Sequence, residues 1–112
     1  MAGGGRMKKY AIDDELMPRK KKQDIMHRAC NRYGTQNQLL KTIEECNELG
    51  SAIAKYLISP KSKENENHVL EEIADVSIMI QQLRTFIFDD AEIEYIERKK
   101  LERLEGWLKN GR

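Results

Sequence analysis

The sequence predicts an all-α protein that folds as a single domain. Three observations lead to this prediction. Apolar residues recur at helical spacing over long segments, aromatic residues make up only 6% of the chain, and there are only two prolines. Few aromatics and prolines favour a helical protein over a small β barrel. A chain of 112 residues is expected to form one domain, and pairing with a second copy would add to its modest core.

Composition and charge exclude several classes of protein. There are 20 Lys and Arg against 19 Asp and Glu, so the net charge of +1 gives the whole chain no signal for a polyanionic partner. No run of about 18 apolar residues predicts a membrane span, and the N-terminus lacks the apolar core of a signal peptide. Two cysteines are too few for a disulfide framework. We therefore expect a cytoplasmic protein.

The first part of the chain differs from the rest. Residues 1–17 are expected to form a flexible leader, and residues 18–112 a single helical domain. The glycine-rich opening, residues 1–6, is typical of an added N-terminal sequence, which makes Met7 a plausible natural start.

A first helix is predicted over about residues 23–33, with Pro18 opening it and Gly34 ending it. The three lysines at 20–22 precede this segment. Such a run is more often a solvated helix end than a phosphate contact.

A second helix is predicted over about residues 36–58. Thr35 is expected to cap it, and Ser59-Pro60 to stop it, because proline cannot continue the backbone ladder. Its apolar stripe is expected to face inward, with Gly50 allowing close approach of another helix and Cys46 as a buried thiol. The members of this stripe are Leu39, Ile43, Cys46, Gly50, Ile53 and Leu57.

Two more helices complete the expected fold. Residues 61–67 are polar and predict an exposed loop, followed by a buried central helix over about residues 67–88. Asp89-Asp90 can cap a last, amphipathic helix over about residues 91–109. The expected inward residues are Val69, Ile73, Val76, Ile80, Leu83 and Ile87 on the third helix, and Ile93, Ile96, Leu101, Leu104 and Leu108 on the fourth.

Acidic residues are clustered on the second and third helices. The second helix carries Glu44, Glu45 and Glu48 in the pattern E-E-x-x-E, and the third carries Glu72 and Asp75 in the pattern E-x-x-D. Acids three residues apart project to nearly the same side of a helix. In an antiparallel helix pair, the four carboxylates of the two E-x-x-(E/D) pairs would form an oxygen-rich site for a hard divalent cation.

The alternative is that these acids are ordinary surface charge, since glutamate is a good helix former. Their position on the helical wheel argues against it, because two of them fall among apolar residues. The apolar neighbours are Val76, Met79 and Leu83 for Glu72, and Leu49, Ala52 and Tyr56 for Glu45. Of nearby basic residues, Lys41 can reach Glu44 or Glu45 and little else is available. A divalent metal would relieve the repulsion.

The ligand type indicates the metal. Carboxylates suit Mg²⁺, or alternatively Mn²⁺, whereas zinc prefers histidine and cysteine. His27 and His68 show no ligand spacing with the acids, and the Glu-x-x-His pattern of di-iron bundles is absent from the sequence. Since Mg²⁺ is usually held by a few carboxylates together with substrate phosphates, a phosphate-bearing substrate is implied.

The two acidic motifs, with 23 residues between Glu48 and Glu72, resemble those of the all-α nucleoside triphosphate pyrophosphohydrolase superfamily. This superfamily includes the MazG-like proteins, the dimeric dUTPases, the dCTP pyrophosphatases and the phosphoribosyl-ATP pyrophosphohydrolases. The resemblance covers about residues 23–103. It implies a four- to five-helix bundle assembled as a homo-oligomer, either a homodimer or a homotetramer.

The resemblance also implies a reaction, in which a nucleoside triphosphate is hydrolysed to the monophosphate and pyrophosphate by metal-activated water. By the family pattern, the metal ligands are Glu45, Glu48, Glu72 and Asp75. Glu44 and Glu45 are the expected catalytic residues, with Glu44 orienting or activating water.

The family holds phosphate with basic residues on its last helix, which implies Lys100 and Arg103 here. The alternative is that this basic stretch is merely solvated, and an asparagine found there in some relatives has no counterpart at matching spacing. Tyr33, Tyr56 and Trp107 are candidates for stacking on a base, although packing is the commoner role for such aromatics.

The sequence leaves two alternatives to an Mg²⁺-dependent pyrophosphohydrolase. The first is a non-catalytic, helical oligomeric module for regulation or interaction, which the intact acidic motifs disfavour. The second is a small nucleic-acid binder that uses the basic residues at 19–22 and 98–100, which the balanced net charge disfavours. We therefore expect a nucleoside triphosphate as the partner, with no membrane and no nucleic acid.

Overall fold

A computed structural model of the chain describes residues 16–111. Its elements in chain order are α2 (Arg19–Tyr33), α3 (Thr35–Ile58), α4 (Lys63–Gln82), the π-helix η1 (Leu83–Ile87) and α5 (Asp90–Asn110). This part of the chain contains no strand, so the all-α prediction is confirmed. The predicted leader lies outside the described residues except for its last two, and Met7 lies outside them as well.

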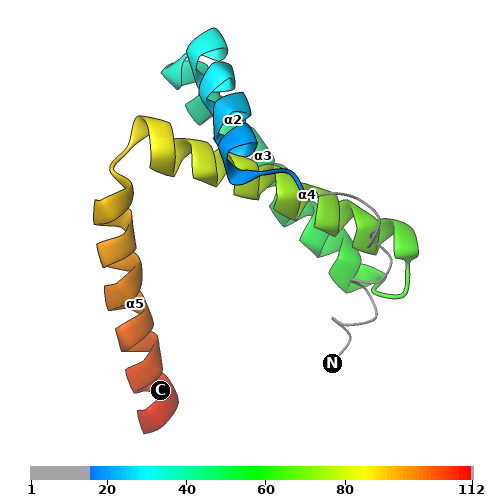
Figure 1. The fold of residues 1–112 in the computed structure, drawn as a ribbon. Coiled ribbons are helices and arrows are strands. Elements are labelled where there is room, and N and C mark those ends of the chain that lie inside the picture. The colour runs from blue at the N-terminus through cyan, green and yellow to red at the C-terminus, as the bar shows by residue number, and fades with distance from the viewer. Residues whose placement is uncertain (1–15, 112) are drawn as a thin grey trace.

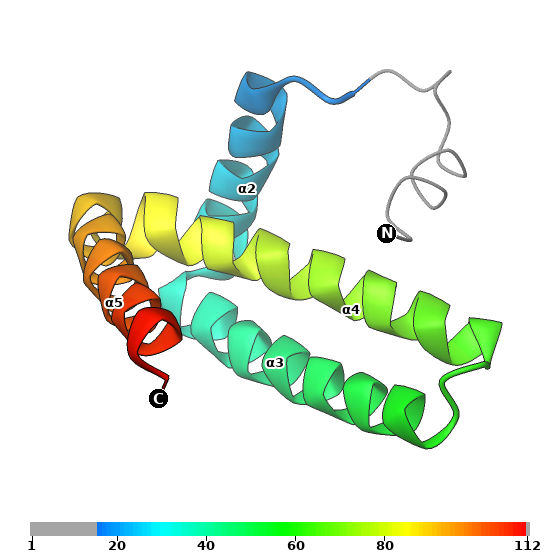
Figure 2. The same cartoon turned by 90° about the horizontal axis from the view of Figure 1, so that it is seen from below.

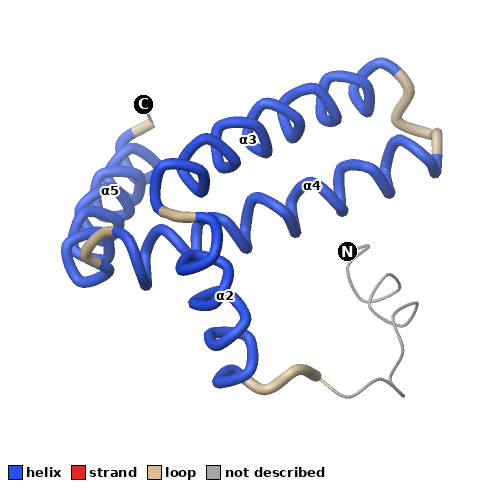
Figure 3. The backbone as a smooth tube through the Cα atoms, turned by 90° about the horizontal axis from the view of Figure 1, so that it is seen from above, coloured by secondary structure: helices blue, strands red, loops and turns tan. Residues whose placement is uncertain are grey.

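Helices α3 and α4 pack against each other more extensively than any other pair of described helices. They form an antiparallel hairpin (Figure 2). Helix α2 crosses this hairpin at one end, where it packs against both α3 and α4 (Figure 3). Helix α5 follows η1 and leads away from the hairpin (Figure 1), packing mainly on η1. None of the helices within residues 16–111 is long and apolar enough to cross a membrane.

A single glycine separates α2 from α3. Gly34 has φ +86°, which an L side chain rarely adopts, and its backbone N–H donates to the carbonyl of Cys30 at 2.9 Å. Gly34 thus ends α2 as predicted. Thr35 is the first residue of α3 rather than its cap, and Gly34 itself occupies the cap position. The start of α2 lies four residues before the predicted one, because the carbonyl of Pro18 already accepts from Lys22 N–H at 3.1 Å.

The turn between α3 and α4 is shorter than predicted. Helix α3 ends at Ile58, before Ser59-Pro60, as expected. Helix α4 begins at Lys63, because the Ser62 hydroxyl accepts a hydrogen bond from Asn65 N–H at 3.1 Å. The segment predicted as a loop is therefore largely the first turn of α4, where Glu64 and Glu66 lie favourably in the helix dipole.

The connection between α4 and α5 contains a π-helix that the sequence did not predict. In η1, Phe88 N–H donates to the carbonyl of Leu83 at 2.7 Å, a five-residue step. Asp89 caps α5 as predicted, its Oδ1 accepting from Ala91 N–H at 2.9 Å. The Arg84 guanidinium then pairs with Asp90 and Glu97, which ties η1 to the first turns of α5.

Much of the predicted apolar stripes is exposed within one chain, and the members that are half-buried are Leu39, Val69, Val76, Leu83, Ile87 and Ile93. Ile43 is 58% exposed, Leu57 71% and Leu108 78%, and Cys46 is also exposed. A Cβ added at Gly50 would meet nothing within 4 Å, so none of the helices in residues 16–111 approaches it closely. The side chains that are buried among the described residues are instead Met26, Gln38, Glu45, Ala52, Glu72, Met79 and Gln82. The face between α3 and α4 is thus more polar than the pattern predicted.

Candidate metal centre

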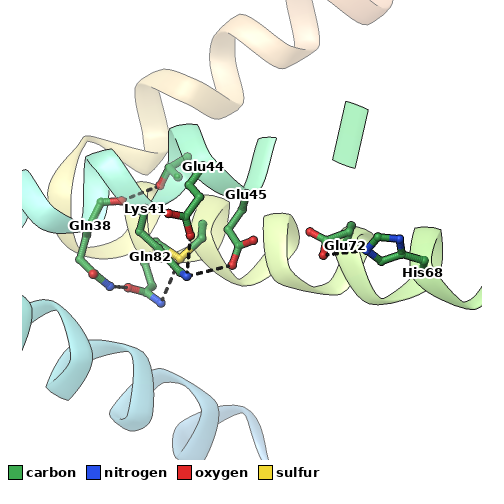
Figure 4. Close-up of polar contacts among 9 residues, drawn as sticks. Gln38, Lys41, Glu44, Glu45, His68, Glu72 and Gln82 are labelled. Atoms are coloured by element: carbon green, nitrogen blue, oxygen red, sulfur yellow. Dashed lines mark hydrogen bonds and ion pairs between the residues drawn. The ribbon is translucent and has the colours of Figure 1, made fainter. Parts of the chain in front are cut away.

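Three of the predicted ligands converge between α3 and α4. One carboxylate oxygen each of Glu45, Glu72 and Asp75 can be chosen such that all lie within 4.8 Å of one another. Glu45 comes from the middle of α3, and the other two lie three residues apart on α4, so they share one side of that helix. The antiparallel hairpin therefore brings acids from both motifs close together, and Figure 4 shows Glu45 on α3 and Glu72 on α4.

Burial distinguishes this cluster from surface charge. Glu45 is 8% exposed and Glu72 is 6% exposed, while Asp75 lies nearer the solvent. Among the described residues, Glu72 Oε2 is fully buried and has no hydrogen-bond partner. Leaving a buried carboxylate oxygen unsatisfied is unfavourable, since it has lost water and gained nothing in exchange. This oxygen is available to a ligand that the protein itself does not provide.

The electrostatics of Glu72 bring in the fourth predicted ligand. Burial raises the pKa of the Glu72 carboxyl, and the negative charges of Glu48, Asp75 and Glu45 raise this pKa further. Glu48 is thus close enough to repel Glu72, although it does not belong to the tight group of three. A divalent cation among these carboxylates would offset both the repulsion and the burial.

His68, which the sequence did not indicate as a ligand, adjoins the cluster. His68 Nε2 lies 3.7 Å from Glu72 Oε1, and the imidazole lowers the pKa of that carboxyl. The two residues are four apart on α4 and therefore face the same side. His68 does not belong to the group of three possible ligands, and its four-residue spacing from Glu72 was the signal for this contact.

Glu44 and Lys41 form the rim of the cluster on α3. Lys41 Nζ lies 3.0 Å from Glu44 Oε1 and 3.5 Å from Glu45 Oε2, so one ammonium joins both acids. This is the pairing that the sequence predicted for Lys41. The hydrogen bond to Glu44, together with the charges of Glu44 and Glu45, raises the pKa of Lys41. Glu44 itself is largely exposed and points less deeply between the helices than Glu45.

The predicted phosphate-binding residues, Lys100 and Arg103, lie on α5, which leads away from the hairpin (Figure 1). With Tyr95, Ile96 and Lys99 they line a shallow pocket of about 220 Å³. The Arg103 guanidinium lies 5.2 Å from the centre of the Trp107 ring, over its face. Within one chain the structure does not bring these two basic residues into the acidic cluster.

Two glutamines that the sequence analysis did not single out continue the buried face beyond the acids. Gln38 Nε2 donates to Gln82 Oε1 at 2.6 Å, and Cys30 Sγ donates to the same oxygen at 3.3 Å. Gln38 precedes Glu45 by seven residues and Gln82 follows Asp75 by seven. A seven-residue spacing keeps a residue on the same helix face, which was the signal that could have found them.

The residues present fit a hard divalent cation. All donors in the group of three are carboxylate oxygens, and one buried oxygen lacks a partner, which suits Mg²⁺ or Mn²⁺ better than a soft metal. No protein-family model, no curated protein and no solved structure matches this chain. Inferences about its function therefore rest on the geometry of this centre.

Proposed function

We propose that the protein is a Mg²⁺-dependent nucleotide pyrophosphohydrolase, which cleaves a nucleoside triphosphate to the monophosphate and pyrophosphate. The observation that carries the proposal is the convergence of Glu45, Glu72 and Asp75, together with the buried, unpartnered oxygen Oε2 of Glu72. Mg²⁺ prefers few carboxylates and completes its shell with water and substrate phosphates. An all-carboxylate centre open on its Asp75 side supports a phosphate-bearing substrate.

Each residue of the centre has a distinct part in this proposal. Glu45, Glu48, Glu72 and Asp75 hold the metal, which when bound neutralises phosphate charge and makes water more acidic. Glu45 is positioned by Lys41, whose ammonium lies 3.5 Å from its Oε2.

Glu44 lies on the solvent side of Lys41, where its carboxylate can orient the attacking water and accept the proton that the water loses. Glu45, the other expected catalytic residue, shares this work from the inner side. No covalent intermediate with the protein is required.

The proposal includes a homodimer or homotetramer. Large apolar side chains on α3, α4 and α5 are exposed, whereas the buried apolar residues of the described chain are only Met26, Ala52 and Met79. So small a core stabilises a single copy poorly, and exposed apolar stripes at helical spacing fit another helix. Lys100 and Arg103, which lie away from the acids of their own chain, would reach phosphate in the centre of another copy.

The same apolar faces favour the second candidate, a non-catalytic helical oligomeric module. That function needs the exposed stripes but gives no reason to keep Glu72 Oε2 buried and unpartnered. A nucleic-acid binder is less well supported, because Arg98 and Lys99 are already engaged by Glu102 at 2.9 and 3.7 Å.

The testing experiment is a panel of canonical and modified nucleoside triphosphates incubated with the protein and Mg²⁺. The expected product is pyrophosphate and not orthophosphate. Glu48→Gln and Asp75→Asn are expected to abolish turnover while leaving the helical circular dichroism unchanged.

Glu71→Gln is the matched control, since Glu71 is exposed on α4 beside Glu72 and is expected to keep its activity. Full activity in both Glu48→Gln and Asp75→Asn would show that the centre has been assigned to the wrong residues. Absence of turnover with every triphosphate would favour the non-catalytic module.

A further inference from the structure

A groove lies beside the metal centre, where α2 crosses the hairpin of α3 and α4. Its volume is about 480 Å³, which is ample for a heterocyclic base. Its lining includes Tyr33, Asn37, Gln38, Lys41, Met79 and Gln82. The proposed function uses the carboxylates and leaves this groove without a role.

The floor of the groove is a buried pair of amides. Gln38 is 6% exposed and Gln82 is 4% exposed, and they are joined by the 2.6 Å hydrogen bond from Gln38 Nε2 to Gln82 Oε1. This bond fixes both side chains, and the thiol of Cys30 supports Gln82 Oε1 from α2. The two amide groups are therefore held rigidly at the crossing of three helices.

The pair leaves hydrogen-bonding capacity unused. Among the residues that the structure describes, the amide N–H group of Gln82 donates only to the thioether of Met79, at 3.9 Å, and a thioether is a weak acceptor. Within residues 16–111 no donor reaches Gln38 Oε1. The groove is thus lined by one strong donor and one strong acceptor that lack strong partners, next to the apolar surface of Met79.

The groove lies about as far from the acids as the base of a nucleotide lies from its phosphates. Lys41 lines the groove and also lies 3.5 Å from Glu45 Oε2, and Figure 4 shows the amide pair and the acids following one another along the hairpin. Seven residues of α-helix rise roughly 10 Å, which separates Gln38 from Glu45. A nucleotide whose phosphates meet the carboxylates would extend its base about this far.

We infer that the groove takes the base of the substrate, and that Gln38 and Gln82 read the edge of that base. This inference rests on the proposed function and extends it to substrate selection. Base edges carry donors and acceptors side by side, and a glutamine amide is complementary to such an edge. Met79 and the ring of Tyr33 provide polarizable and aromatic surface for the flat faces of the base.

Methionine methyl NMR tests the inference on the wild-type protein. The probes are α,β-methylene nucleoside triphosphates with different bases, which lack the bridging oxygen to be hydrolysed, and inorganic tripolyphosphate, which lacks a base. The Met79 methyl signal, assigned with Met79→Leu, is expected to shift with at least one nucleotide and not with tripolyphosphate. Met26, which lies outside the groove, is the internal control. A Met79 signal that no nucleotide shifts at millimolar concentration would overturn the inference.

Kinetics with variants gives a second readout. Gln38→Met keeps the length of the side chain and removes its polar atoms, and Gln82→Met does the same on α4. Each is expected to reduce the ratio of kcat/KM between the best and worst bases by about tenfold, the effect of losing one base-edge contact. Gln36→Met, on the exposed side of α3, is expected to leave the ratio unchanged. Unaltered ratios in both folded groove variants would overturn the inference.

These outcomes separate the inference from the proposed function. Hydrolysis by the wild-type protein with a silent Met79 signal would leave the pyrophosphohydrolase standing and remove the base groove. A Met79 signal that responds to nucleotides in a protein without hydrolytic activity would support the groove and remove the enzyme.

Discussion

Glu45 of α3 and Glu72 of α4 face each other across the helix hairpin, and each is less than one-tenth exposed. Two like charges brought together out of water destabilise the fold unless protons or cations accompany them. This relationship makes stability, proton binding and metal binding depend on one another.

Replacing the Glu72 carboxylate with a neutral amide should raise the melting temperature of the metal-free protein. It should also remove the stabilisation by Mg²⁺. In Glu72→Gln, burial no longer opposes a charge at this position, so the melting temperature at neutral pH is expected to rise by several degrees in the presence of a chelator. The wild type should gain stability with millimolar Mg²⁺, by linkage between binding and folding, and the variant should gain little. Thermal unfolding followed by circular dichroism, with Glu71→Gln as control, checks both points. A wild-type melting temperature indifferent to Mg²⁺ would contradict the metal centre.

The pH dependence of stability follows from the raised pKa of Glu72. Because the folded-state pKa is above the unfolded value, near 4.5, the folded protein holds this proton more tightly than the unfolded chain. The stabilising contribution is complete below the unfolded pKa and is lost as pH rises through the folded pKa. The difference in melting temperature between Glu72→Gln and the wild type should therefore widen from pH 4 to pH 7 in metal-free buffer. A constant difference across this range would show that Glu72 titrates as an ordinary surface acid.

His68 should lower the pH midpoint at which the centre binds Mg²⁺. Its imidazole, 3.7 Å from Glu72 Oε1, lowers the pKa of that carboxyl, so removing it should raise this pKa. In His68→Ala the midpoint for Mg²⁺ binding, measured by calorimetry between pH 5 and pH 8, is expected to move to higher pH because protons compete longer with the metal. His27→Ala is the control, since that imidazole stacks on Phe86 instead. An unchanged midpoint in His68→Ala would limit this histidine to a structural role.

The cap of α4 offers a test that is independent of the centre. Ser62→Ala removes the hydroxyl that accepts from Asn65 N–H, and the loss of such a cap costs about 1 kcal/mol. Urea unfolding should show this decrease in the free energy of unfolding. Ser51→Ala, at an exposed position within α3, should be unchanged or slightly more stable, because alanine is the better helix former. Equal stabilities of the two variants would place the start of α4 nearer residue 67, where the sequence pattern had put it.

The sequence correctly predicted those helix ends that a single residue determines by its own backbone or capping chemistry. Gly34 and Pro60 impose a stop, and Asp89 provides a cap, whatever surrounds them. The starts at Arg19 and Lys63 were missed because both first turns are polar and show no apolar periodicity. The π-helix at residues 83–87 was missed too, since no residue in it differs from those of an ordinary α-helix.

The acids were found because they stand among apolar residues on the helical wheel, which is a local property. The packing of whole faces is not local. On α3, the stripe with Ile43 and Ile53 is the more apolar one, yet the face with Gln38, Glu45 and Ala52 meets α4. One chain cannot show by its pattern alone which apolar face meets its own helices and which meets another molecule.

The exposed apolar face of α3 leads to the last prediction, which concerns self-association. Ile53 is 40% exposed and Ile43 58% exposed, and a charge placed there would be buried if a second copy covers the face. Ile53→Asp is therefore expected to shift the protein toward the monomer in analytical ultracentrifugation, since an unpaired buried charge costs several kcal/mol. Ser51→Asp, on an exposed side of the same helix, should leave the assembly intact.

Cysteine alkylation provides the matching measurement without a variant. Cys46 lies exposed on α3, whereas Cys30 is half-buried and burial raises the pKa of its thiol, which slows its reaction. In a dissociated chain Cys46 should react much faster than Cys30. If a second copy covers the stripe that includes Cys46, this thiol should become protected as protein concentration rises, and Ile53→Asp should remove the protection. Rapid alkylation of Cys46 at every concentration, together with a monomeric wild type, would show that the apolar face of α3 is not covered by another copy.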